Sequence, residues 1–405
     1  MEQEGGQYVT LHSLNAIRVC AEYCVVHYHV ALGGHDFLQN KHLANSLMSF
    51  FFVLSGFMAM HTNINTDFSA PGAKMDYISR RLRKVYPTYL IWLILDTPGN
   101  IIQNWEFAAE CKLFWVSIAS QPILLHAWLG SFHIGASNGV CWYLCTLFWL
   151  WIIFPLINTK SLFASRPWTS IACLYAISVL SWIPVSSFNP EDSRELPIMR
   201  LCEFLMGCCV AFTLDKPIYG WWIIPPLLCF GAYCTATYIM EDLWSVGDIP
   251  PACELLSRYQ QQPINLNPTL LLSMFSVVFC LSIHWLAATE KNGGRGISML
   301  HWTCFKSLSR FSLHIYLSHS TVSNFIKHTS KRFGILDWWS TDMLLILCYL
   351  VAYLYSIAEP VLLGQLRFIG RSEFKKGEPP IGNINKSHGS SPLDSSSDEG
   401  AHDDA

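Results

Sequence analysis

The sequence is poor in charged residues. Only 14% of its 405 residues are Asp, Glu, Lys or Arg, whereas 52% are hydrophobic, and soluble domains contain about 25% charged residues. This shortage excludes an ordinary soluble protein and indicates a membrane protein whose partner is the lipid bilayer. The formal net charge of −3 argues against a nucleic-acid partner.

Other absences limit the organisation of the chain. The start, MEQEGGQYVT, lacks the cationic region of a cleavable signal peptide, so the first hydrophobic segment is expected to stay in the mature protein. There is no internal repeat with a period of about 20–50 residues, which excludes a solenoid. The fifteen cysteines lie mostly in apolar runs, where thiols behave as small hydrophobic side chains.

Apolar segments long enough to cross a bilayer recur along the chain. A membrane-spanning helix needs about 20 mainly apolar residues. We therefore predict an all-α fold, a polytopic membrane helix bundle with about ten transmembrane helices. The predicted spans are 13–32, 44–61, 85–102, 139–157, 167–186, 196–214, 220–239, 268–288, 308–326 and 341–363. The stretch 112–130, interrupted by Pro122, is predicted to be re-entrant or interfacial, with an eleventh span as the alternative.

Loop charges predict the orientation. Lysine and arginine accumulate in cytosolic loops. If the N-terminus is cytosolic, most of the loop lysines and arginines of this chain lie on the cytosolic side. The segment IKHTSKRFG (326–334) departs from this rule. We expect a multi-pass protein with both termini in the cytosol. Its parts are a short cytosolic N-terminus (1–12), a transmembrane domain (13–365) and a disordered acidic cytosolic tail (366–405).

The first predicted span contains side chains that a bilayer disfavours. In LNAIRVCAEYCVVHYHV (14–30), an α-helix would place Arg18, Glu22 and His29 on one face, with a rise of about 16 Å from Arg18 to His29, while His27 would point away. Such groups usually face the bundle interior or an aqueous cavity, so this stripe is a candidate site. The alternative is an Arg18–Glu22 ion pair that joins helices, with His29 hydrogen-bonded in the core.

A second polar stripe lies in the ninth predicted span. Three- and four-residue steps place five side chains on one helix face, where they line an acceptor path or make interhelical hydrogen bonds. They are Ser309, Ser312, Tyr316, His319 and Ser323.

Three further patterns have structural alternatives. The basic cluster Arg80, Arg81, Arg83 and Lys84 either binds phosphate groups or anchors the loop on the cytosolic side. Arg200 and Glu203 are one helical turn apart and form either a structural ion pair or part of the same cavity. The Ser55–Gly56 pair in LSGF predicts a close approach of two helices.

These segments together resemble a known family. An arginine followed eleven residues later by histidine, here Arg18 and His29, is similar to the first span of acyltransferase family 3, a family of integral-membrane O-acyltransferases. Further matching segments follow in the family's order: SFFFVLSGFMAM (49–60), SRRLRKVYPTYL (79–90), MRLCEFLMGCCVA (199–211), LSRFSLHIYLSHS (308–320) and IAEP (357–360). The chain departs from the family pattern at Asn15, Leu147 and Ser309, which weakens the transfer of acidic roles and of the usual sugar acceptor.

The resemblance implies transfer of an acyl group, commonly acetyl, from cytosolic acyl-CoA to a hydroxyl of a carbohydrate, a glycolipid or a hydroxylated metabolite. Acyl-CoA would be a donor substrate; we expect no permanently bound cofactor and no metal. His29 is assigned as general base because histidine titrates near neutral pH, with Arg18 and Glu22 completing the catalytic group.

The resemblance also assigns binding roles. The phosphates of coenzyme A are assigned to Arg80, Arg81, Arg83, Lys84 and Tyr86, and the acceptor to Ser312, Tyr316, His319, Trp142, Arg200 and Glu203. One alternative is acyl transfer to an amino group. Another is a proton-coupled transporter, which also needs buried His, Arg and Glu, although the paired halves of such transporters are not evident in the sequence.

Overall fold

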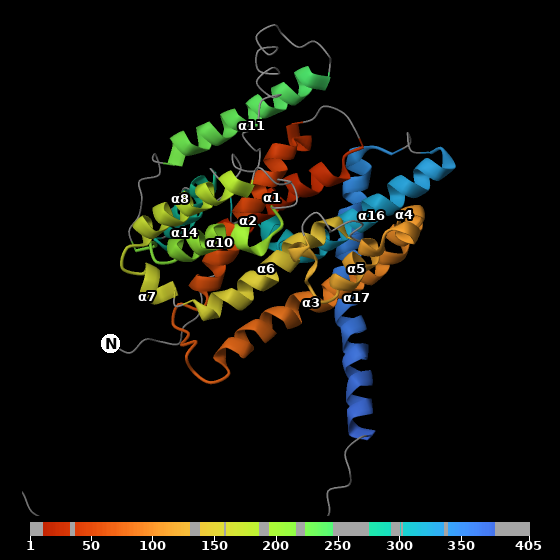
Figure 1. Cartoon of the computed structure of the whole chain (residues 1–405), viewed down its shortest axis with the longest axis horizontal. Coiled ribbons are helices and arrows are strands. Elements are labelled where there is room, and N and C mark those ends of the chain that lie inside the picture. Colours follow the sequence, from red (N-terminus) through yellow and green to blue (C-terminus); the bar gives the residue numbers. More distant parts are fainter. Residues whose placement is uncertain are drawn as a thin grey trace, which may run out of the picture. The chain divides into compact units, whose positions relative to one another are not determined.

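The computed structural model describes residues 11–32, 37–129, 138–157, 159–185, 194–215, 223–245, 275–292, 300, 303–335 and 339–376. All regular secondary structure in these residues is helical, which confirms the all-α class (Figure 1). The chain divides into two compact units, Met1–Glu359 and Pro360–Ala405. The predicted N-terminal segment up to residue 10 and the tail beyond residue 376 lie outside the described residues.

A helix overlaps each of the ten predicted spans. The bounds are α1 His12–Val30, α2 Lys41–His61, α3 Ala73–Gln103, α6 Trp142–Ile153, α8 Pro167–Val185, α10 Pro197–Val210, α11 Ile224–Ser245, α14 Ser276–Lys291, α16 Ser312–Phe333 and α17 Thr341–Lys376. Shorter helices are α4 Trp105–Glu110, α5 Lys112–Ser120, α7 Thr159–Phe163 and α15 Thr303–Leu308, and 3-10 turns at Gly139–Cys141 and Phe154–Leu156 extend α6.

Three segments of the described chain are long and apolar enough to cross a membrane. They are Lys41–His61, Gly139–Leu156 and Thr341–Gly364. Among the other helices, α10 has only 14 residues, and α1 carries Arg18 and Glu22. Apolar helices of this length support a membrane protein, while the number of about ten spans stays a prediction.

The stretch 112–130 does not form one continuous helix. Helix α5 ends at Ser120, Leu124 adopts a left-handed conformation with φ 55°, and a 3-10 turn follows at His126–Trp128. A single helical eleventh span through this stretch is therefore excluded. The expected re-entrant or interfacial position stays a prediction.

Helices α2 and α10 pack with their backbones in close contact. A Cβ atom added to Gly56 would lie 1.8 Å from the carbonyl oxygen of Phe204, and one added to Gly207 would lie 1.9 Å from that of Val53. Neither helix tolerates a larger residue at the crossing, because such distances are far inside van der Waals contact. The predicted close approach at Gly56 is confirmed, and Gly207 is its counterpart.

Polar contacts join several helix ends on one side of the bundle. The Glu290 carboxylate accepts hydrogen bonds from the backbone N–H groups of His12 and Ser13, at 2.7 and 2.9 Å, and so satisfies unpaired donors at the start of α1. Lys291 Nζ donates a 2.6 Å hydrogen bond to Asp215 and lowers the pKa of that carboxyl. These contacts link loops that the charge pattern assigns to the cytosolic face.

Candidate functional site

The two predicted polar stripes face each other across α1 and α16. Arg18 Nη2 donates a 2.9 Å hydrogen bond to the Ser309 carbonyl, the Ser312 hydroxyl donates to the Glu22 carboxylate, and the ring centroids of His29 and His319 lie 5.4 Å apart. We call these contacts the α1–α16 seam. Residues from opposite parts of the chain thus form one continuous polar line.

The start of α16 differs in detail from the prediction. The helix begins at Ser312, and Ser309 lies in the preceding turn. Its backbone carbonyl, rather than its hydroxyl, meets Arg18, while the hydroxyl donates to the carbonyl of Lys306 at 3.0 Å. A backbone acceptor at this position does not depend on the side chain, so the departure of Ser309 from the family pattern leaves the contact intact.

His319 has a defined hydrogen-bonding state. Its Nδ1 lies 3.1 Å from the carbonyl oxygen of Ile315, and a carbonyl only accepts, so Nδ1 must donate. In the neutral imidazole the lone pair is then on Nε2, and Nε2 has no hydrogen-bond partner among the described residues. An imidazole nitrogen able to accept a proton therefore lies beside His29.

The two histidines of α1 lie in different surroundings. His29 lies at the surface of the protein, and its ring contacts those of Tyr28 and His319. His27 is 5% exposed, and its ring lies 6.0 Å from that of Tyr23 on the same helix. Only His29 belongs to the seam, as the helical phase predicts.

A cap from α16 holds the end of α1 that carries His29. Lys327 Nζ donates to the carbonyl oxygens of His29 and Ala31 at 3.1 and 2.9 Å. The last carbonyls of a helix lack intrahelical partners and carry partial negative charge, so a lysine stabilises them. This contact gives a physical reason for one positive charge of the segment 326–334, which departs from the loop-charge rule.

Tyr143 of α6 is a site residue that the sequence reasoning missed. Its hydroxyl lies 3.2 Å from Ser55 Oγ, its ring lies 5.6 Å from that of Tyr316, and it interacts electrostatically with Arg18. Tyr316 in turn donates to the Val140 carbonyl and has its ring 6.0 Å from that of His319. Tyr143 thus connects α6 to the seam.

Trp142, which the resemblance assigns to the acceptor, lies outside the seam. It is 8% exposed and belongs to the main hydrophobic cluster, where its ring contacts Phe52. Neighbouring helical residues point about 100° apart, so the tryptophan packs in the core while Tyr143 faces the seam. The aromatic run CWYLC signals both residues, but the sequence alone does not choose between them.

The basic cluster on α3 divides into two groups. The guanidinium of Arg81 lies 4.7 Å from the ring centroid of Tyr77 and 5.3 Å from that of Trp151, a cation–π geometry that turns it inward. The side chains of three other members are exposed: Arg80, Arg83 and Lys84. Tyr86 donates a 2.8 Å hydrogen bond to the Pro122 carbonyl, which holds it against the 121–125 segment.

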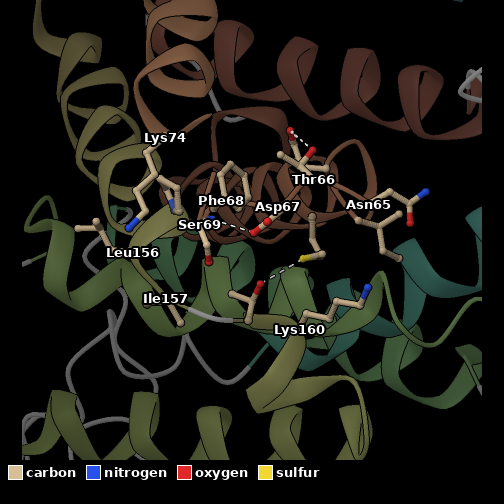
Figure 2. A pocket seen from close by; sticks show the side chains of 14 residues that line it. Asn65, Thr66, Asp67, Phe68, Ser69, Lys74, Leu156, Ile157 and Lys160 are labelled. Carbon is tan, nitrogen blue, oxygen red and sulfur yellow. Dashed lines mark hydrogen bonds between the residues drawn. The ribbon is translucent and has the colours of Figure 1, made fainter. Parts of the chain in front are cut away.

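A polar pocket of about 350 Å³ lies where α3 begins. Figure 2 shows Lys74 and Lys160 on different parts of its wall, with Asp67 between them. Asp67 accepts a 2.8 Å hydrogen bond from the backbone N–H of Ser69, which fixes the loop between α2 and α3. Because Lys74 precedes Arg80 by about one and two-thirds helical turns, this pocket and the basic cluster occupy the same end of α3.

Arg200 and Glu203 form a buried, hydrogen-bonded ion pair. Arg200 Nη1 lies 3.1 Å from both Glu203 oxygens, and the side chains are 1% and 0% exposed. Ser49 and Ser276 donate to the same carboxylate, at 2.9 and 3.3 Å. Such full pairing is typical of a structural ion pair, and this geometry favours that alternative over a substrate contact.

The comparisons with known proteins identify the domain. A family model described as an acyltransferase domain, that of acyltransferase family 3, matches residues 11–357. This range contains both helices of the seam and the basic cluster of α3. Neither a curated protein nor a solved structure matches the chain.

Proposed function

The chain belongs to acyltransferase family 3, and we propose that it transfers an acyl group, most simply acetyl, from acyl-CoA to a hydroxyl of a carbohydrate, glycolipid or hydroxylated metabolite. The observation that carries the proposal is the pairing of His29 with His319 at one end of the α1–α16 seam. An accessible imidazole held by a capped helix end and a second helix has the arrangement that a general base requires.

Four side chains are proposed to take part in the reaction: His29, His319, Arg18 and Glu22. His29 removes the proton of the acceptor hydroxyl while that oxygen attacks the carbonyl carbon of the thioester and forms the new C–O bond. The C–S bond then breaks, and His29 returns the proton to the sulfur of the departing coenzyme A. His319 Nε2, which has no partner among the described residues, contacts the acceptor beside the reacting hydroxyl. Arg18 and Glu22 hold α1 against α16 and so position His29.

The donor is proposed to enter at the basic end of α3. The phosphates of coenzyme A need several cationic donors, which the exposed Arg80, Arg83 and Lys84 supply. Arg81 stacks on Tyr77 and Trp151 and shapes the inner wall. The pocket with Lys74 and Lys160 gives room at the same end for the bulky part of the donor.

The proposal is tested with purified protein and acetyl-CoA. Release of free coenzyme A thiol, dependent on an extract of hydroxylated compounds and absent in His29→Ala, supports it. Mass spectrometry of polysaccharides, glycolipids and small metabolites from cells with and without the gene then identifies the acceptor. Mild alkaline hydroxylamine removes the group from an ester but not from an amide, so a resistant product would identify amino-group transfer. No thiol release with any acceptor, despite folded protein, would overturn the proposal.

A further inference from the structure

Arg194, just before α10, is a cation that lies near the proposed base. Together with Lys327 it acts electrostatically on the His29 imidazole. Lys327 Nζ already donates to two backbone carbonyls at the end of α1, those of His29 and Ala31. Arg194 belongs to none of the segments that resemble the family. It is therefore a charge at the reacting end of the seam that the steps described so far do not use.

The guanidinium of Arg194 is held at one nitrogen and has donors left for a ligand. Its Nη1 donates a 3.0 Å hydrogen bond to the side-chain oxygen of Asn45 on α2. Its Nε is buried and has no hydrogen-bond partner among the described residues. A guanidinium carries several N–H donors and no acceptor, and a buried donor without an acceptor is costly. An acceptor oxygen on a bound substrate would remove that cost.

The backbone around Arg194 is fixed from two sides. Its carbonyl accepts a 2.8 Å hydrogen bond from Nε of Arg200, whose guanidinium is itself held by the buried ion pair with Glu203. The next carbonyl, that of Glu195, accepts a hydrogen bond from the Thr146 hydroxyl of α6. A charged group that is fixed in advance at a reacting centre needs no reorganisation during the reaction. The buried ion pair thus positions the turn that carries Arg194.

The helices that hold this turn meet the seam near its histidine end. Thr146 follows Tyr143 by three residues, so both side chains lie on one face of α6, and the Tyr143 ring lies 5.6 Å from that of Tyr316 in the seam. Helix α1 ends at residue 30 and α2 begins at residue 41, so Asn45, in the second turn of α2, lies at the same end of the bundle as His29. Two hydrogen bonds therefore bring this guanidinium to the reacting end of the seam, in agreement with its electrostatic action on the imidazole.

We propose that Arg194 stabilises the negative charge that develops on the thioester carbonyl oxygen during acyl transfer. This inference rests on the proposed function and adds a further catalytic residue to it. When the acceptor oxygen attacks the carbonyl carbon, the π electron pair of the C=O bond moves to the carbonyl oxygen, which accepts a hydrogen bond from Nε of Arg194. The C=O bond forms again as the C–S bond breaks, and the sulfur takes the proton from His29. Arg194 keeps its own protons throughout, because a guanidinium stays charged at neutral pH.

The test measures release of coenzyme A thiol by the full-length protein, with varied acetyl-CoA and a fixed extract of hydroxylated compounds, at the pH of maximal rate. Arg194→Gln should lower the apparent kcat by about 100- to 1,000-fold, as loss of an oxyanion donor does, and leave the KM for acetyl-CoA unchanged. Arg194→Lys keeps the charge without the planar fork and should lose about tenfold. Added guanidinium ion should restore part of the kcat of Arg194→Gly. Arg166→Gln, an exposed arginine before α8, is the control and should match wild type.

Rates are normalised to monodisperse protein, and Asn45→Ala, which removes the same side-chain hydrogen bond, measures the structural share of any loss. A wild-type kcat in Arg194→Gln or Arg194→Lys would overturn the inference. So would a loss confined to the KM, or a loss in Arg194→Gln that equals that of Asn45→Ala, with no rescue of Arg194→Gly by guanidinium. His29→Ala, measured in parallel, separates this inference from the proposed function. If only His29→Ala loses thiol release, the Arg194 assignment alone fails; if the wild-type protein releases no thiol, both fail.

Discussion

The imidazole rings of His29 and His319 lie 5.4 Å apart, although the two residues come from the first and the penultimate long helices of the described chain. Lys327, two helical turns after His319, holds the end of the His29 helix through two backbone carbonyls. The same helix thus supplies the neighbour of the proposed base and the cap that fixes its position.

Replacing His29 by alanine should reduce acyl transfer by at least about 100-fold, the usual contribution of a general base, without changing the yield of folded protein. His27→Ala is the matched control on the same helix; because His27 is buried, its loss should lower thermal stability and leave turnover per folded molecule close to wild type. Rates normalised to monodisperse protein measure both. Equal loss of turnover in the two variants would contradict the assignment of the base to His29.

Arg83, one of the two exposed arginines of the basic cluster, should act on the donor alone. Arg83→Gln should raise the KM for acyl-CoA by about three- to tenfold through loss of a charge-assisted contact to phosphate, with the KM for the acceptor unchanged. Lys306→Gln, another exposed cation expected on the same face, is the control. An unchanged KM for acyl-CoA in Arg83→Gln would contradict the donor contact and show that this arginine only anchors the loop on the cytosolic side.

Arg81 is expected to behave differently from Arg83. Because its guanidinium stacks on Tyr77 and Trp151, Arg81→Gln should lower stability by about 0.5–1 kcal/mol or more, in addition to any effect on the donor KM. Thermal unfolding in detergent, followed with and without saturating acyl-CoA, separates the two effects. A variant with wild-type stability would show that the stacked geometry contributes nothing.

The crossing of α2 and α10 predicts a strong effect of a single methyl group. Gly56→Ala and Gly207→Ala each force a Cβ into a facing carbonyl, so each should destabilise the protein by about 1–3 kcal/mol and lower its melting temperature. Gly231→Ala in α11, where a Cβ meets nothing within 4 Å, should be neutral or stabilising because alanine favours a helix. Similar melting temperatures for all three variants would contradict the close crossing.

Sidedness can be measured in sealed vesicles of known orientation. With a membrane-impermeant acyl-CoA on the cytosolic side and an impermeant glycoside acceptor on the other, we expect product, because α3 carries the basic cluster near one end and, toward its other end, a separate pocket of about 470 Å³ that Asp96 and Asn100 line. Vesicles with both substrates on the cytosolic side should form none. Product only in this second arrangement would refute the two-sided model and leave the acyltransferase assignment intact.

The periodicity of the sequence predicted both halves of the site but not how they meet. A 3.6-residue repeat places Arg18, Glu22 and His29 on one face, and it does the same for Ser312, Tyr316 and His319. Their pairing is a contact between distant segments, which no local pattern encodes. Tyr143 was missed for a similar reason, since only the packing of α6 decides which member of an aromatic run faces the seam.

Asp96 shows a signal that the sequence did contain. A carboxylate inside a predicted membrane span is itself a reason to expect a function, but Asp96 belongs to none of the family-like segments. The structure adds what the sequence lacks, namely the walls from α16 and α17 that turn this residue into part of a pocket. By contrast, only three segments of the described chain are long and apolar enough to cross a membrane, because polar side chains at helix contacts interrupt the apolar stretch of helices such as α1.

The seam also sets an order for biosynthesis. Helix α1 leaves the ribosome first with Arg18, Glu22 and the carbonyls at its end, while the Ser309 carbonyl, Ser312 and Lys327 that satisfy them are translated near the end of the domain. Until then the nascent chain must keep unpaired polar groups within or beside the membrane, where chaperones and quality-control proteases can bind them. A premature stop between α14 and α16 is therefore expected to cause degradation of the whole chain rather than accumulation of a stable fragment.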